Sequence, residues 1–323
     1  MTYRPLSTHD LVGVVVALSL YATPSFGQAE PPMETHAFKH VGTLPILADV
    51  YKPSGPGPHA VVLWIHGGAL ILGDRAGLSS QLRDLLLAEG YAICSIDYRL
   101  APATKLSGIH EDVVDAYAWL RREGPAKFSL DPNRIAVMGS SAGGYLTLSG
   151  GYLFEPRPAA LVSLWGYGDI AGAWYSRPDP FYLKRERISR DVAEQAVRDG
   201  MVTESRENRE RYKFYLYCRQ NGLWPLRVTG VDPHRFPQAY DAWCPLRNIT
   251  KDYPHTLLVH GDKDTDVPFE QSVLMAAELQ RVGIEHRFLT LTGVGHGLGG
   301  VDKERVLKVY HDILGFLRPR LAR

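Results

Sequence analysis

The chain has 323 residues, and 45% of them are hydrophobic, which is enough for one or two domains with a substantial core. Its 36 basic and 35 acidic residues give a formal net charge of +1. No excess of either sign therefore favours nucleic acid or an anionic surface as a partner, and we expect no nucleic acid partner.

An apolar run near the N-terminus is typical of a secretory signal peptide. It covers residues 11–22, between a polar start with one basic residue, Arg4, and a segment of small and turn-forming residues. The pattern predicts a signal peptide over 1–27 and a secreted or periplasmic protein. The run is shorter than the about 20 residues that cross a bilayer, so we expect cleavage and no stable membrane insertion afterwards.

Strand-like and helix-like patterns alternate along the first half of the chain. Apolar runs that predict buried strands and periodic segments that predict helices follow one another here. The strands are predicted at 44–51, 58–68, 91–98, 133–140 and 159–166, and the helices at 78–90, 110–122 and 142–153. Alternation of this kind predicts an α/β fold with a mostly parallel, doubly wound sheet.

The alternation stops between residues 167 and 250 and then resumes. Charges of both signs fill 184–213, which favours a solvated helical face, and aromatic residues flank it. This composition predicts a mainly helical cap whose aromatic residues line a pocket or form a small core of their own. Strands at 255–261 and 285–291 and helices at 269–283 and 303–317 follow. We therefore predict one catalytic domain over 28–323, with a cap inserted at about 167–250.

A candidate nucleophile lies where the strand at 133–140 meets the next helix. Gly139, Ser140, Ser141, Ala142 and Gly143 form a Gly-x-Ser-x-Gly sequence in a strand–turn–helix context. The glycines leave room for a sharp turn that exposes the central hydroxyl, and the N–H of the next residue points toward a forming oxyanion. This predicts Ser141 as the nucleophile and a structural role for Ser140.

A serine hydroxyl needs a base, and the base needs an orienting acid. His296 lies in a glycine-rich loop just after a predicted strand, which favours it as the base. The loop after the strand at 255–261 supplies three candidate acids, Asp262, Asp264 and Asp266. Their positions alone leave the choice among the three open.

The predicted strand at 58–68 ends in small residues that can form an oxyanion hole. Backbone N–H groups approach a reacting oxygen closely only where side chains are small. We predict that the N–H groups of Gly68, Ala69 and Ala142 bind the oxyanion.

These motifs resemble those of α/β-hydrolases of the carboxylesterase and hormone-sensitive-lipase-like kind. The resemblance covers the sequences HGGA (66–69), DYRLAP (97–102), GSSAGG (139–144), HGDKDTDVP (260–268) and GVGHGL (293–298), in the family's order. It implies an α/β-hydrolase fold, selects Asp264 as the acid, and implies structural roles for His66 and Asp97. The chain departs from the family in having Ala69 and Ser140 where glycine and aspartate are usual. Its extra mass also lies at 167–250 instead of at the N-terminus.

The chain has three cysteines. Cys94 lies in a predicted strand and is expected to be a core thiol. Cys218 and Cys244 lie outside the strand pattern, and export leaves open whether they form a disulfide. No spacing resembles a zinc or iron–sulfur site, and we expect neither metal nor organic cofactor.

The sequence therefore predicts a secreted serine esterase that uses a Ser-His-Asp triad and an acyl-enzyme. The substrate is expected to be a small-molecule or polymer-attached ester of short-acyl, aromatic or carbohydrate type. Two alternatives stay open: a serine peptidase of prolyl-oligopeptidase type, and an inactive binding protein on the same fold. The sequence does not fix the oligomeric state.

Overall fold

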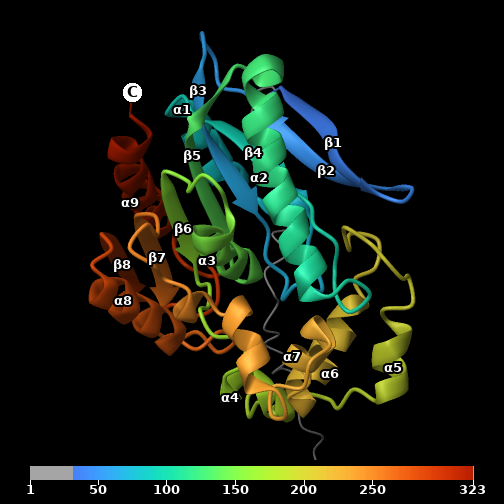
Figure 1. Ribbon diagram of the computed structural model, residues 1–323. Coiled ribbons are helices and arrows are strands. Elements are labelled where there is room, and N and C mark those ends of the chain that lie inside the picture. Colours follow the sequence, from blue (N-terminus) through green and yellow to red (C-terminus); the bar gives the residue numbers. More distant parts are fainter. Residues whose placement is uncertain (1–31, 323) are drawn as a thin grey trace, which may run out of the picture.

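The computed structural model describes residues 32–322, so the predicted signal peptide over 1–27 lies outside the described residues. Within residues 32–322, eight strands form one sheet in the order β1-β2-β4-β3-β5-β6-β7-β8 (Figure 1). The strands are β1 (Met33–Val41), β2 (Leu44–Tyr51), β3 (His59–Ile65), β4 (Ala92–Ile96), β5 (Leu130–Ser140), β6 (Ala160–Leu164), β7 (Thr256–Gly261) and β8 (His286–Leu291). β1 and β2 pair antiparallel to their neighbours, and the remaining pairs are parallel. The predicted mostly parallel sheet is confirmed.

Helices cover both faces of the sheet because successive side chains of the central strands point to opposite sides. In β3, Val62 and Trp64 belong to the apolar cluster on one face, and Val61 and Leu63 to the cluster on the other. α1 (Ser80–Ala88) and α9 (Lys303–Leu321) pack on the first face, and α2 (Leu106–Phe128), α3 (Ala142–Leu153) and α8 (Glu270–Val282) on the second. None of the described helices is both long and apolar enough to cross a membrane.

A mainly helical segment, here called the cap, lies between β6 and β7. Residues 167–250 form no strand, and their helices gather at one end of the sheet (Figure 1). These helices are α4 (Ala173–Ser176), α5 (Arg190–Gln195), α6 (Arg211–Asn221) and α7 (Trp224–Thr229), with short 3₁₀ turns at Tyr182–Lys184, Pro237–Trp243 and Pro245–Arg247.

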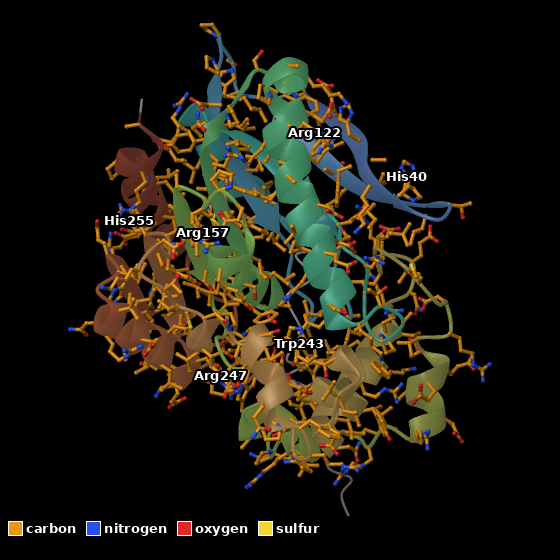
Figure 2. The ribbon with its side chains drawn as sticks, viewed as in Figure 1. His40, Arg122, Arg157, Trp243, Arg247 and His255 are labelled. Atoms are coloured by element: carbon orange, nitrogen blue, oxygen red, sulfur yellow. The ribbon has the colours of Figure 1, made fainter. Side chains whose placement is uncertain are left out.

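The returning end of the cap is fastened to α3, the helix that follows Ser141. The Tyr145 hydroxyl donates a 2.8 Å hydrogen bond to the carbonyl of Trp243. Beyond α3, Arg157 (labelled in Figure 2) donates to the carboxylate of Asp252 at 3.0 Å, just before β7. The cap is therefore tied to the same element that positions the candidate nucleophile.

The structure differs from the sequence-based prediction at three places. β1 was not predicted, because it is an edge strand with a largely exposed, mixed pattern. α2 begins at Leu106 and passes Pro125, so it is longer than the predicted 110–122; it ends at Phe128, and the C-cap residue Ser129 has a φ of 55°. The segment 184–213 is not a uniformly solvated face, because Arg211 is completely buried.

All three cysteines are free and buried. Cys94 lies in β4, as expected of a core thiol. Cys218 and Cys244 are not paired, so the disulfide that the sequence left open does not occur in this structure. The Cys244 thiol instead donates to the carboxylate of Asp169 at 3.4 Å.

Candidate active site

Ser141 occupies a sharp, strained turn between β5 and α3. Its φ of 54° and ψ of −119° fall outside the regions that side chains usually allow. A Cβ at Gly143 would lie 2.0 Å from the carbonyl oxygen of Ile65, and one at Gly139 would lie 2.4 Å from the carbonyl oxygen of Gly143. The two glycines are therefore required for β3, β5 and α3 to approach so closely. Such strain costs about 1–3 kcal/mol and gathers at functional sites.

The three residues predicted as nucleophile, base and acid lie in one hydrogen-bonded row. His296 Nε2 is 3.1 Å from the Oγ of Ser141, and His296 Nδ1 is 2.7 Å from Oδ2 of Asp264. The carboxylate can only accept, so Nδ1 carries the proton and Nε2 is left to accept from the serine hydroxyl. The three residues follow β5, β7 and β8, whose carboxyl ends meet at one edge of the sheet.

The three aspartates that were candidates for the acid make different contacts. Asp262 accepts a 2.6 Å hydrogen bond from the N–H of Gly293, which fixes the start of the histidine loop. Asp264 binds Nδ1 of His296, as the family resemblance implied. Asp266 turns toward the other ring nitrogen, with its Oδ2 3.5 Å from Nε2 of His296.

Asp264 is buried and surrounded by donors. Its Oδ1 accepts from the N–H groups of Asp266 at 2.8 Å and Val267 at 2.9 Å. Its Oδ2 also faces Nε2 of His260 at 3.1 Å. Burial raises the pKa of the Asp264 carboxyl, but the bonds from His260 and His296 outweigh it and hold that pKa well below its usual range. The carboxylate is therefore ionised wherever the site could work.

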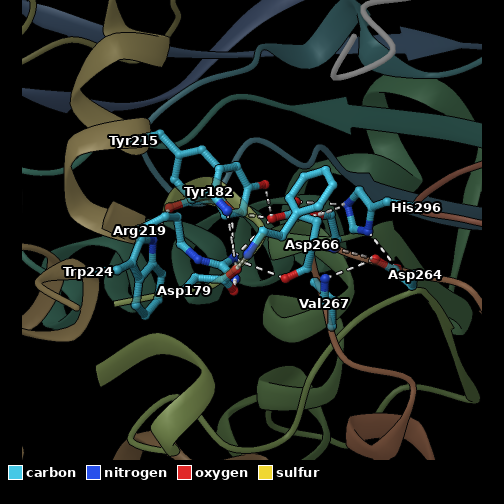
Figure 3. Close-up of polar contacts among 12 residues, drawn as sticks. Asp179, Tyr182, Tyr215, Arg219, Trp224, Asp264, Asp266, Val267 and His296 are labelled. Atoms are coloured by element: carbon cyan, nitrogen blue, oxygen red, sulfur yellow. Dashed lines mark hydrogen bonds and ion pairs between the residues drawn. The ribbon is translucent and has the colours of Figure 1, made fainter. Parts of the chain in front are cut away.

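His296 sits between two carboxylates (Figure 3). Burial lowers the pKa of its imidazole, but the charge of Asp266 and the bond to Asp264 together exceed that effect. The pKa of His296 is raised above its ordinary value. This contribution of Asp266 was not predicted from the sequence, in which Asp266 is only an alternative to Asp264 as the acid.

Asp266 belongs to a buried polar network that reaches into the cap (Figure 3). Its Oδ1 accepts from the hydroxyls of Tyr182, at 2.6 Å, and Tyr215, and from Nη1 of Arg219 at 3.0 Å. Arg219 also binds Asp179 and lies 4.7 Å from the ring centre of Tyr182. Tyr215 and Arg219 are four residues apart on α6, a spacing that places them on one helix face and was a usable signal in the sequence.

The predicted oxyanion-hole residues lie beside Ser141 with unused donors. Gly68 and Ala69 have positive φ values of 109° and 55° in the loop after β3. Ala142 opens α3 directly after Ser141. Among the described residues, no group accepts a hydrogen bond from the N–H of Gly68, Ala69 or Ala142. The three donors are thus available for a ligand oxygen.

The cap holds the loop that carries these donors, residues 66–73, here called the oxyanion loop. Trp224 Nε1 donates to the carbonyl of Ala69 at 2.9 Å. Arg211 Nε donates to the carbonyl of Ile71 at 2.8 Å. These contacts were not predicted from the sequence.

His66 and Asp97 make the contacts of structural residues. The ring of His66 stacks on Tyr98 at 4.2 Å, and its Nδ1 donates to the carbonyl of Gly67. Burial lowers the pKa of His66 to about 4. Asp97 is buried and pairs with Arg75 at 2.7 Å. No cluster of His, Cys, Asp and Glu within residues 32–322 is arranged to hold a metal ion.

Comparison with known proteins agrees with this geometry. Residues 62–299 match a family described as alpha/beta hydrolase fold. The chain belongs to the α/β-hydrolase family. The α/β-hydrolase family that the sequence motifs resemble is thereby confirmed.

The chain is also similar to individual proteins and to solved structures. Over 84% of the chain, it is 30% identical to Esterase LipC of Mycobacterium tuberculosis and covers 61% of that protein. It is 27% identical over 82% of its length to the polyketide synthase Preu6 of Preussia isomera, of which it spans 14%. An alpha/beta hydrolase superfamily protein from Enterococcus faecalis has the same fold, with a TM-score of 0.69 and 24% identity over 88% of this chain and 98% of that one.

Proposed function

We propose that this α/β hydrolase is a secreted serine carboxylic-ester hydrolase that acts through Ser141, His296 and Asp264. The observation that carries the proposal is the row of contacts from Ser141 Oγ to His296 Nε2 to Asp264, beside three unused N–H donors. This arrangement brings a nucleophile, a base, an orienting acid and an oxyanion site together in space, although they lie far apart along the chain.

In the first half of the reaction, His296 Nε2 takes the hydroxyl proton while Ser141 Oγ attacks the ester carbonyl. The carbonyl oxygen becomes an oxyanion bound by the N–H groups of Gly68, Ala69 and Ala142. Asp264 holds the ring so that Nε2 faces the serine, and stabilises the imidazolium. The tetrahedral intermediate collapses when Nε2 returns the proton to the leaving alcohol, which departs and leaves an acyl-Ser141.

In the second half, water takes the place of the alcohol. His296 removes a proton from the water, which attacks the acyl carbonyl, and the oxyanion forms in the same site. Collapse breaks the bond to Ser141 Oγ, which recovers its proton from Nε2. The carboxylic acid leaves and the enzyme returns to its starting state. Each bond broken in this sequence is matched by one formed, and no further reactant is needed.

Short-acyl, aromatic or carbohydrate esters are the proposed substrates. The esterase named among the relatives supports ester cleavage. Trp165 presents its ring to His296, with 6.5 Å between ring centres at 69°. Aromatic side chains of the cap, including Tyr182 and Tyr215, also reach the site through Asp266. Aromatic rings bind planar or sugar groups well, which favours such esters over long acyl chains.

Hydrolysis of p-nitrophenyl esters from acetate to palmitate, beside a peptide p-nitroanilide, tests the proposal. We expect turnover to be greatest for short acyl chains and to vanish in Ser141→Ala. Ser140→Ala is the matched control, because His296 bonds Ser141 and this variant should keep most activity. Absence of ester turnover, or faster cleavage of the anilide, would contradict the assignment and favour the binding-protein or peptidase alternative.

A further inference from the structure

The two oxygens of Asp266 have unequal surroundings. Oδ1 accepts from Tyr182, Tyr215 and Arg219, so its hydrogen-bonding capacity is used. Oδ2 faces Nε2 of His296 at 3.5 Å, and no other described group contacts it closely enough to bond. One oxygen therefore anchors the side chain, and the other is left as an acceptor within the site.

The anchor holds the Asp266 carboxylate in a fixed position. Arg219 is almost completely buried, and binds Asp266 on one side and Asp179 on the other. The Asp266 side chain is 15% exposed and that of His296 is 20% exposed, so both reach the solvent side of the site. Removing the Arg219 ion pairs from water costs free energy. The stability of the fold alone therefore does not explain why these pairs are buried.

Oδ2 lies near the nitrogen that must protonate the leaving alcohol. In the proposed mechanism, Nε2 returns a proton to the leaving oxygen, which must therefore lie about 2.6–3.2 Å from that nitrogen. Oδ2 of Asp266 lies 3.5 Å from the same nitrogen. A group one or two bonds beyond the leaving oxygen can therefore lie within hydrogen-bond reach of Oδ2.

We infer that Oδ2 of Asp266 selects the leaving alcohol, favouring one with a hydroxyl next to the ester oxygen and disfavouring one with a carboxylate. The inference rests on the proposed function and narrows its substrate class to monoesters of polyols or sugars. A hydroxyl donates a charge-assisted hydrogen bond to Oδ2. A purely apolar alcohol removes water from the carboxylate without replacing it, and an anionic alcohol adds repulsion.

Three acetate esters of nearly equal size test this selection: 2-hydroxyethyl, n-propyl and carboxymethyl acetate. Their kcat/KM values are measured by titrating released acid, at one pH above the pKa of His296. Each value is divided by the ester's rate of hydroxide hydrolysis, which removes differences in intrinsic reactivity. We expect the hydroxyethyl ester to be preferred over the carboxymethyl ester by about tenfold or more, with the propyl ester between them.

Asp266→Asn removes the charge while leaving groups that can bond Tyr182, Tyr215 and Arg219. The preference for hydroxyethyl over carboxymethyl acetate should fall about tenfold in this variant. Asp179→Asn is the matched control, because it removes the other carboxylate on Arg219, away from His296, and should change the ratio by less than about threefold. Equal normalised rates for the three esters in the wild type, or a ratio unchanged in Asp266→Asn, would overturn the inference and leave the esterase assignment intact. Failure of the wild type to cleave any ester would instead remove the proposed function and this inference together.

Discussion

At the residue scale, the turn that holds Ser141 leaves no room for a side chain at its glycines. A Cβ at Gly143 would meet two backbone carbonyl oxygens, those of Ile65 at 2.0 Å and His66 at 2.6 Å. Gly143→Ala should therefore lower the free energy of unfolding by about 1–3 kcal/mol and displace Ser141. Gly315→Ala is the control, because that glycine lies in α9 with open space around it. This substitution should raise the free energy of unfolding by up to about 1 kcal/mol. Urea unfolding of both variants checks this; equal stabilities would contradict it.

A second residue-scale prediction concerns the acid limb of the pH–activity profile. The proposed base must be neutral, so activity should fall as the pH drops through the raised pKa of His296. Asp266→Asn removes a charge that raises this pKa, and should move the acid-limb midpoint of kcat/KM to lower pH by about one unit. Tyr182→Phe keeps the Asp266 charge and should leave the midpoint nearly unchanged. A midpoint that stays in place in Asp266→Asn, or moves upward, would contradict the assigned electrostatics.

At the scale of elements, α6 and α7 connect the cap both to the oxyanion loop and to Asp266 beside His296. Arg211 and Trp224 hold the oxyanion loop, while Tyr215 and Arg219 hold Asp266. Arg211, Tyr215 and Arg219 recur every four residues and so share one face of α6. The cap is therefore part of the catalytic framework and not only a cover over it.

Removing one of these contacts should lower kcat more than it raises KM. Trp224→Phe keeps the stack on Tyr175, at 4.0 Å, but loses the bond to the Ala69 carbonyl. We expect a loss of about 1–3 kcal/mol in stability and about tenfold in kcat, because the oxyanion donors shift. The control is Trp174→Phe, whose indole bonds Asp169 in the same aromatic cluster without touching the loop. Equal kcat losses in the two variants would show that the contact with Ala69 has no special role.

At the scale of the whole molecule, the structure predicts three free thiols. Cys94, Cys218 and Cys244 are buried, and burial raises the pKa of Cys244 to about 12. Alkylation of the unfolded protein without reductant should therefore add three labels, as measured by intact mass. A protein carrying one label and one disulfide would show that Cys218 and Cys244 pair after export, against this structure.

Features that depend on local sequence patterns could be predicted, whereas features that depend on contacts between distant residues could not. Strand and helix alternation is a local pattern, so the sheet from β2 to β8 could be predicted. Ser141 and His296 could be predicted from the short motifs around them, whereas only the family resemblance selected Asp264 among three aspartates. The edge strand β1 lacks a clear local pattern and was missed. The buried state of Arg211 and the position of Asp266 beside His296 depend on tertiary packing, because the partners lie far apart in sequence. From its charge alone, Arg211 was expected to be solvated.

The role of Ser141 as the nucleophile can be tested most directly by locating the reactive residue chemically. The wild type, Ser141→Ala and Ser140→Ala are treated with a fluorophosphonate, and the adduct is mapped by peptide mass spectrometry while ester hydrolysis is followed. We expect one adduct, on Ser141, in the wild type and in Ser140→Ala, with activity lost in proportion to labelling and no adduct in Ser141→Ala. Labelling at another residue that accompanies the loss of activity, or full activity in Ser141→Ala, would contradict it.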